Sequence, residues 1–357
     1  HMIASTPEHL GAILELVKDT MMHRMKAIPN DIENQMWSNI FDNVRVYCIA
    51  NISRFKMVFP NNTPKGTLSM VIKLLRIVSD SDEESTAVLM SCVEKQNSKT
   101  YDKLFYWNAE TTRLCCDQFI QMCVGIFDDL REDKILYQAE FPQDFNLVEL
   151  SVEYYLQKLA KDVEQLFKTL GNTAPTSDVF QLFFKLTDLL CLFEKLTSKT
   201  GTDLLRIIPL YTYMKPYMIK WSSDITLQWK DWAAKAVELD KWEVLSPRLM
   251  HSSSVVDLFA SLHQSLQFLR ALDWKPKSDL KTVLGDYVTG ISQVIIFYFD
   301  NVQKSFIQDA ATASFADTNS PQLKATLVRL CVRLNNVESA RSHLDDLSKE
   351  LITVFTY

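Results

Sequence analysis

The sequence predicts an all-α protein built as an elongated rod of stacked helical bundles. Glycine occurs only 7 times in 357 residues, far below its usual share of ~7%, and sandwiches, barrels and doubly wound sheets rely on glycine in their tight turns. Apolar side chains recur at three- and four-residue steps over long segments, which is the period of helices. Helices of such length form extended stacks rather than a compact ball.

The N-terminal segments predict two helices. Ser5 and Glu8 have the spacing of a capping box, which marks the start of the first helix. Residues 10–25 then place their apolar side chains on a single helical face. A second helix is expected over residues 32–59, because the stretch 60–66, rich in proline and asparagine, is typical of a loop.

The next segments alternate long helices with polar connections. The helical period restarts over 68–78. The acidic run 79–85 is interpreted as a solvated turn leading into a helix start, where carboxylates complement the helix dipole. One long helix is expected from Tyr101 to about Leu136, and residues 141–144 close this first section.

The second half predicts buried helices. Residues 180–193 are apolar on nearly all sides, so this helix is expected at the centre of a bundle. Pro209 and Pro216 are expected to break the segment that follows. The uncharged run 287–299 is too short to span ~30 Å of hydrocarbon, so we expect a buried core helix there. Four tryptophans are interpreted as packing anchors between helices: Trp221, Trp229, Trp232 and Trp242.

These elements group into three expected bundles. We expect an N-terminal helical bundle over residues 3–145 and a central bundle over 146–275. Residues 276–357 are expected to begin a third, truncated bundle. His1 and Met2 read as a remnant of the expression vector.

The sequence offers no recognisable catalytic, cofactor or metal site. Gly285 and Gly290 have the spacing of a phosphate-binding loop, but Ile291-Ser292 stands where a lysine is required. The histidines lack H-E-x-x-H spacing, and the seven cysteines include no C-x-x-C pair. We therefore expect no enzyme activity, no cofactor and no metal.

The charge balance also limits the classes of partner. A formal net charge of -6 without a basic stripe argues against nucleic-acid binding. The odd number of cysteines suits reduced thiols, and the N-terminus lacks a signal peptide, so a cytoplasmic location is expected.

Five segments carry a family resemblance. Four of them resemble the first homology region of the MUN domain of uncoordinated-thirteen vesicle-priming factors: Met214–Trp221, Trp232–Asp240, His251–Phe259 and Leu262–Leu266. Leu334–Arg341, with its paired asparagine opening a long helix, resembles a second motif of this family. The sequence is thus identified as similar to the first half of such a domain, from a fungal or other divergent relative.

The resemblance implies a non-enzymatic vesicle priming or tethering factor. Proteins of this family resemble subunits of vesicle-tethering complexes and promote SNARE complex assembly in exocytosis. The implied partners are a syntaxin-type SNARE and a Sec/Munc-type chaperone, and the implied location is cytoplasmic and peripheral at vesicle or plasma membranes. Any membrane-binding modules would lie outside this sequence. Two alternatives share the architecture: a subunit of an exocyst-like tethering complex, and a helical signalling scaffold without SNARE binding.

The resemblance also points to candidate partner-binding residues. Alignment of the motif places His263 and Leu266 where the family has an asparagine and a phenylalanine that contact syntaxin, and Gln267 lies beside them. Leu266 also belongs to a seam at 255, 259, 262, 266 and 269, whose steps of 4, 3, 4 and 3 are those of a helix packing on its neighbours. Both interpretations of this segment, core packing and partner contact, stay open. If His263 contacts the SNARE, the affinity would depend on pH.

Overall fold

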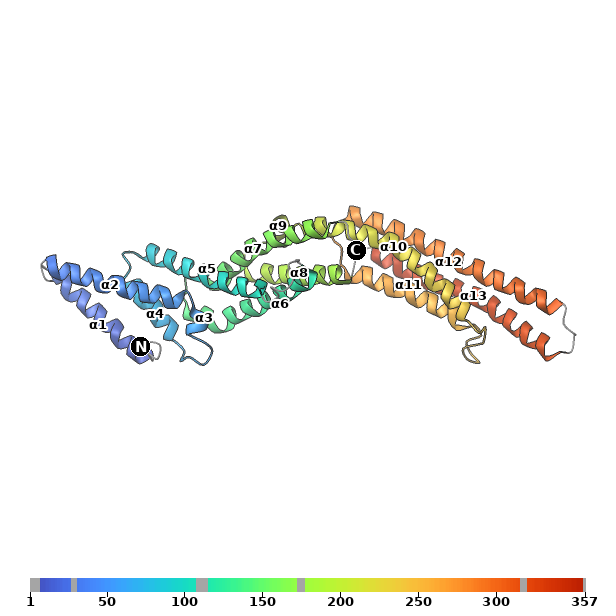
Figure 1. Ribbon diagram of the computed structural model, residues 1–357, viewed down its shortest axis with the longest axis horizontal. Coiled ribbons are helices and arrows are strands. Elements are labelled where there is room, and N and C mark those ends of the chain that lie inside the picture. Colours follow the sequence, from blue (N-terminus) through green and yellow to red (C-terminus); the bar gives the residue numbers. More distant parts are fainter. Residues whose placement is uncertain (1–6, 27–30, 107–114, 172–176, 315–319, 356–357) are drawn as a thin grey trace. The chain divides into compact units, whose positions relative to one another are not determined.

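The computed structural model describes residues 7–26, 31–106, 115–171, 177–314 and 320–355. Within these residues the chain forms thirteen α-helices and no β-strand (Figure 1). The all-α prediction is confirmed. The chain divides into two compact units, of which unit 1 extends to Leu210 and unit 2 begins at Tyr211. Each unit is described by itself below, and the expected division into bundles over residues 3–145, 146–275 and 276–357 stays a prediction.

The described residues of unit 1 form nine helices. A single π-helical turn over Asp133–Tyr137 and a 3-10 turn over Gln138–Glu140 follow α6 without a break. The helices are α1 Pro7–Lys26, α2 Asp31–Ile52, α3 Phe55–Val58, α4 Thr67–Ile77, α5 Asp82–Tyr106, α6 Cys116–Glu132, α7 Leu147–Leu170, α8 Ser177–Leu196 and α9 Gly201–Ile207.

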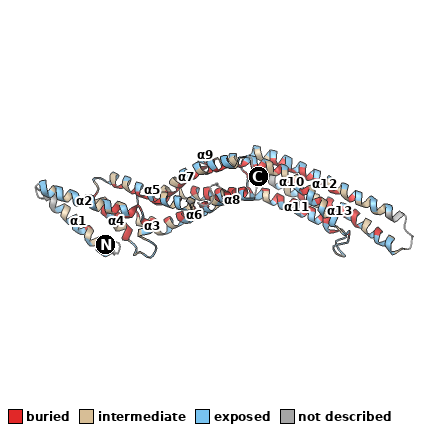
Figure 2. Ribbon diagram, viewed as in Figure 1, coloured by how far each residue is buried: buried red, intermediate tan, exposed pale blue. Residues whose placement is uncertain are grey.

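Several predicted features of unit 1 are confirmed. Residues 60–66 form turns without helix, and α5 begins inside the acidic run with three carboxylates in its first turn. Figure 2 shows buried positions along one side of most helices. In α8 eight side chains are buried, as expected of a central helix.

Two helix boundaries in unit 1 differ from the prediction. The second helix ends at Ile52, and a tight turn separates it from the short α3 that begins at Phe55. The expected helix from Tyr101 to Leu136 was wrong, because Tyr101 lies near the end of α5 and a new helix, α6, begins at Cys116. Apolar periodicity does not register such interruptions, since the same faces stay apolar on both sides of them.

A buried charge cluster joins α3 to α6 and α7 in unit 1. The Lys56 Nζ lies 2.7 Å from Asp129 Oδ2 and 2.6 Å from Asp133 Oδ1. The hydroxyls of Tyr155 and Ser151 donate to Asp129 and Asp133 at 2.7 and 2.8 Å. Burial raises the pKa of Asp133 to about 6, although the Lys56 charge opposes this shift. Two carboxylates and one ammonium are therefore held together away from water.

Unit 2 is built from four long helices. They are α10 Leu210–Leu239, whose first residue belongs to unit 1, α11 Ser253–Ala271, α12 Lys277–Ser314 and α13 Pro321–Phe355. The expected break at Pro209 is confirmed, because α9 ends at Ile207 and α10 starts at Leu210. The expected break at Pro216 was wrong, since α10 continues through this residue.

Packing explains why α10 tolerates its proline. Pro216 has no N–H for the carbonyl of Thr212, and an interior proline costs a helix ~3 kcal/mol. Met214 and Tyr217 on either side of it, and Trp229 three turns later, are almost fully buried. Each large apolar side chain contributes about 1.5–3 kcal/mol when buried, so the apolar face of α10 outweighs the missing hydrogen bond.

Aromatic side chains and one glycine bring α10 and α12 together. Trp229 is fully buried and packs edge-on against Tyr287 at 5.1 Å, while Trp221 stacks on the same ring at 6.3 Å. A Cβ at Gly290 would lie 2.2 Å from the Thr226 hydroxyl oxygen, so any larger residue here requires the Thr226 side chain to shift. The expectation of packing anchors holds for Trp229 and Trp242, whereas Trp232 is 45% exposed.

The apolar run of α12 lies in the core of unit 2. By length and composition α12 is the one helix in the described part of the chain that could cross a membrane. However, Tyr287, Val294 and Tyr298 are fully buried, and α12 packs along α13. The prediction of a buried core helix over residues 287–299 is confirmed for one face of α12, while Val288 and Ile296 on the other face are 38% and 61% exposed.

We predict that Lys56→Met lowers the free energy of unfolding by about 3–5 kcal/mol at neutral pH, because it leaves two buried carboxylates without their cation. A carboxyl with a raised folded-state pKa binds more protons in the folded than in the unfolded state. The deficit should therefore shrink as the pH falls from 7 towards 5. Urea unfolding at several pH values measures both effects.

The matched control is Lys161→Met, at an exposed position on α7, which should change stability by less than about 0.5 kcal/mol. Equal stabilities of the two variants would contradict a role for the cluster.

Candidate interaction surface and its buried support

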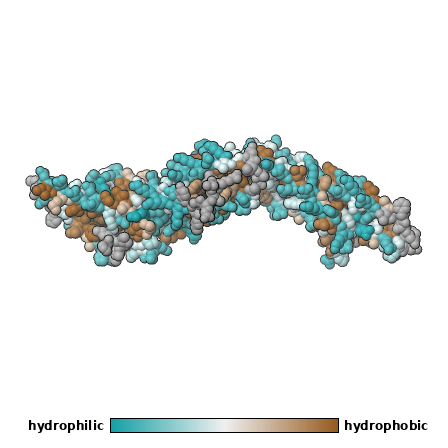
Figure 3. Space-filling model, viewed as in Figure 1, coloured by the Kyte–Doolittle hydropathy of each residue, from teal (hydrophilic) through white to brown (hydrophobic). Residues whose placement is uncertain are grey.

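The outer face of α11 is exposed in unit 2. Val256, Ala260 and Gln267 are solvent-exposed, and His263 is half-buried. A shallow hollow of about 360 Å³ lies where α11 meets the exposed Trp232 of α10. Apolar side chains on the visible surface of both units are otherwise scattered among hydrophilic ones (Figure 3). This face of α11 therefore combines an aromatic ring with polar side chains, as many interfaces do.

His263 lies beside a carboxylate of α13. Its Nδ1 lies 3.4 Å from the Glu350 Oε1, and the guanidinium of Arg270 lies 3.5 Å from the other carboxylate oxygen. Arg270 also donates to the Glu350 carbonyl at 2.8 Å. Since these side chains are 26–39% exposed, the contact is screened by water and leaves them accessible to a partner.

Leu266 points into the core. It is fully buried, and so are the other members of the predicted seam. The structure thus brings His263 and Gln267 to the surface and places Leu266 beneath them, out of reach of a partner in this conformation. The seam residues are Val255, Phe259, Leu262, Leu266 and Leu269.

The two sequence motifs meet in a buried hydrogen-bond network. The Asn336 side-chain oxygen accepts from the Ser252 N–H at 2.8 Å. Its amide nitrogen contacts the hydroxyls of Ser252, Ser254 and Tyr298 at 2.8–3.2 Å. Burial raises the pKa of Tyr298 to about 12, so its hydroxyl keeps its proton. Asn336 of α13 therefore joins the start of α11 to the middle of α12.

Asp240 and Arg333 extend this network into the connection between α10 and α11. The Asp240 carboxylate accepts from the Ser252 hydroxyl and from the Trp242 N–H at 2.5 and 2.8 Å. Trp242 has a φ of 56°, a strained value for a bulky residue. The Arg333 guanidinium stacks on its ring at 4.2 Å and pairs with Asp309 at 2.9 Å. These contacts hold the connection in place behind α11.

The network was not recognised from the sequence as a unit. Its members are serines, a tyrosine, an asparagine, an aspartate and an arginine, and they are spread along the sequence from Asp240 to Asn336. The only signal was the paired asparagine motif. In the described residues, no group of three potential ligands could hold a metal ion.

Comparison with known families decides the classification. A family model of the MUN domain matches residues 85–352, three quarters of the chain and parts of both units. The chain belongs to the MUN domain family. MUN domains are non-enzymatic trafficking domains that act in vesicle priming and exocytosis.

One relative of the MUN chain comes from fission yeast. Over 123 residues the chain is 22% identical to the protein described as "Uncharacterized protein C11E3.02c" of Schizosaccharomyces pombe. The aligned part covers 34% of this chain and 9% of that protein, so the chain spans a small part of its length. This similarity gives weak support to the expected fungal relationship.

We predict that Asn336→Ala destabilises unit 2 by about 2–4 kcal/mol, because the Ser252 N–H and three buried hydroxyls of α11 and α12 each lose a hydrogen-bond partner. The neighbouring Asn335 is exposed and donates a single hydrogen bond to the Met250 carbonyl. Asn335→Ala should therefore cost less than about 1 kcal/mol. Urea unfolding monitored by tryptophan fluorescence compares the two variants, and equal losses would contradict the central role of Asn336.

We also predict that Leu266→Ala lowers stability by about 2–4 kcal/mol, since it opens a cavity in the seam. Gln267→Ala, at the adjacent exposed position, should stay within about 0.5 kcal/mol of the unchanged chain. Thermal unfolding of both variants measures the difference, and a Leu266→Ala protein as stable as its neighbour variant would show that the side chain is not packed as described.

Proposed function

We propose that this MUN chain is a vesicle priming or tethering factor that promotes SNARE complex assembly in exocytosis by binding a syntaxin-type SNARE. The family match over residues 85–352 carries the proposal. The chain acts through contact rather than catalysis, together with a Sec/Munc-type chaperone. It works from the cytoplasm, at the periphery of vesicle or plasma membranes, with membrane attachment supplied by other modules.

The outer face of α11 is the proposed contact for the SNARE. His263 and Gln267 lie on it, and the ring of Trp232 borders the hollow beside Ala260. A helix of the partner would place an apolar side chain against Trp232 and polar side chains against Gln267 and His263. The buried network behind α11 keeps this face rigid, which reduces the entropy lost on binding.

We predict that His263→Ala and Gln267→Ala each weaken binding of a syntaxin-type SNARE at least about fivefold, in the absence or presence of the chaperone, without loss of stability. Isothermal titration with the cytoplasmic region of the SNARE gives the affinities. Gln303→Ala, at an exposed position on α12, is the matched control and should bind like the unchanged chain.

The pH dependence tests the histidine separately. Because histidine changes its charge over the range of about pH 5–8, affinities measured at about pH 6 and pH 8 should differ for the unchanged chain and coincide for His263→Ala. No measurable binding of the SNARE would overturn the proposed function. Binding that neither His263→Ala nor Gln267→Ala weakens would show that the SNARE contacts a surface other than α11.

A further inference from the structure

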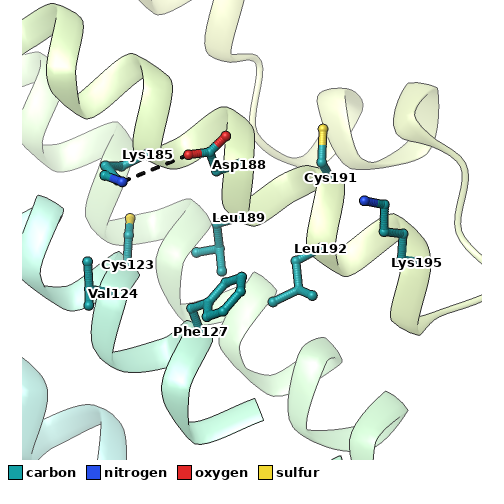
Figure 4. Close-up of a pocket in the computed structure, with 9 residues that line it drawn as sticks. All are labelled: Cys123, Val124, Phe127, Lys185, Asp188, Leu189, Cys191, Leu192 and Lys195. Carbon is teal, nitrogen blue, oxygen red and sulfur yellow. Dashed lines mark ion pairs between the residues drawn. The ribbon is translucent and has the colours of Figure 1, made fainter. Parts of the chain in front are cut away.

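A second surface of different chemistry lies in unit 1, in a groove between α6 and α8. The groove has a volume of about 560 Å³, and among the described residues its lining comes from these two helices (Figure 4). Cys123 and Leu189 form its floor and are almost completely buried. None of its residues takes part in the network or the α11 face described above.

Large apolar side chains line the groove without being covered. Phe127 and Val124 of α6 are 42% and 41% exposed. The Phe127 ring faces Leu189 and Leu192 of α8, so one aromatic edge is packed and the other is open to water (Figure 4). Exposing an aromatic ring in this way sacrifices the free energy that its burial would contribute, which is typical of a surface that a partner covers.

The margin of the groove carries a specific charge pattern. Lys185 and Lys195 lie at opposite ends (Figure 4), ten residues apart in α8, or ~15 Å along its axis. The Lys185 ammonium is 3.9 Å from Asp188, a long contact at the surface. In the part of the chain that the structure describes, Lys195 forms no ion pair. The lining therefore has a net charge of +1, with a cation at each end.

We propose that this groove docks an amphipathic helix of a partner protein, with the apolar face on Phe127 and acidic side chains paired with Lys185 and Lys195. A helix of about three turns spans the distance between the two lysines. Its side chains at i, i+3, i+4 and i+7 form a ridge that fits an apolar groove between two helices. Acidic side chains beside this ridge would pair with Lys185 and Lys195, whereas basic side chains in the same positions would be repelled by the two lysines.

The same observations make a membrane surface a poor occupant. The apolar side chains line a hollow instead of protruding, and Asp188 stands between the two lysines. A lipid headgroup layer is flat, and its attraction to a protein grows with clusters of several basic residues. A single net positive charge around a concave apolar surface suits a helix better.

The chain carries a natural reporter for this groove. Cys191 lies on α8 among the lining residues and is solvent-exposed. Cys331 on α13 is also exposed and belongs to unit 2. A helix seated in the groove covers Cys191 and leaves Cys331 accessible, so the two thiols form an internal comparison within one protein.

The experiment uses the full chain and two synthetic helical peptides of about 16 residues with leucines at i, i+3, i+4 and i+7. One peptide has glutamates beside the leucines, and the other has lysines at the same positions. Alkylation by N-ethylmaleimide is followed at each cysteine by mass spectrometry. We expect the acidic peptide to slow alkylation of Cys191 at least about tenfold at saturation and to leave Cys331 unchanged, with no protection by the basic peptide.

Variants test the two halves of the proposal. Phe127→Ala should weaken the acidic peptide about tenfold, and Lys195→Glu about threefold or more. Lys161→Glu, the same charge reversal at an exposed position of α7, is the matched control and should bind as the unchanged chain does. Lys195→Glu changes only a surface side chain, so the test remains valid even where Phe127→Ala reduces folding.

Other results would overturn the proposal. These are equal binding of the two peptides, equal protection of both cysteines, or affinities that neither Phe127→Ala nor Lys195→Glu changes. Protection of Cys191 by anionic phospholipid vesicles but not by the acidic peptide would assign the groove to a membrane. Protection that appears on raising the protein concentration alone would assign it to a second copy. Because the groove and the α11 face lie in different units, loss of SNARE binding has no bearing on this result.

Discussion

The register of the long helices depends on a few buried polar groups. Apolar seams hold helices together but allow them to slide, because one leucine contact resembles the next. Hydrogen bonds and ion pairs in a dry interior have one satisfactory geometry and are costly when broken. Asn336 provides this constraint in unit 2, where it joins α11, α12 and α13. Lys56 provides it in unit 1, between α3, α6 and the π-helical turn.

The buried polar contacts also fix the positions of the side chains on the exposed faces of the same helices. α11 has its inner face locked by the seam and by Asp240, so His263 and Gln267 stand at fixed positions on the outside. α6 has an inner face held by Asp129 and an outer face that carries Phe127. A protein that acts through contact gains from such helices, because rigid surfaces lose little entropy when a partner binds.

The sequence predicted the helical architecture well because a helix is specified by the spacing of residues that are close together in the sequence. The spacing of apolar residues identified the seam around Leu266, and the acidic run located the start of α5. The continuation of α10 through Pro216 was missed, since tertiary packing overrides a local penalty. The Lys56 cluster and the Asn336 network were also missed, because their members are distant in sequence and individually ordinary. The partner contact at His263 and Gln267 remains a prediction, because it depends on a second molecule.

The crossing at Gly290 has a consequence for how such chains diverge over evolution. A methyl group there would collide with Thr226, and the α12 backbone passes close to the ring of Trp229. Exposed positions on these helices tolerate many substitutions, whereas a side chain here requires the Thr226 hydroxyl to give way. Relatives that have drifted to low overall identity should therefore retain a glycine here or change position 226 together with it, which makes this pair of positions a marker for tracing distant ancestry.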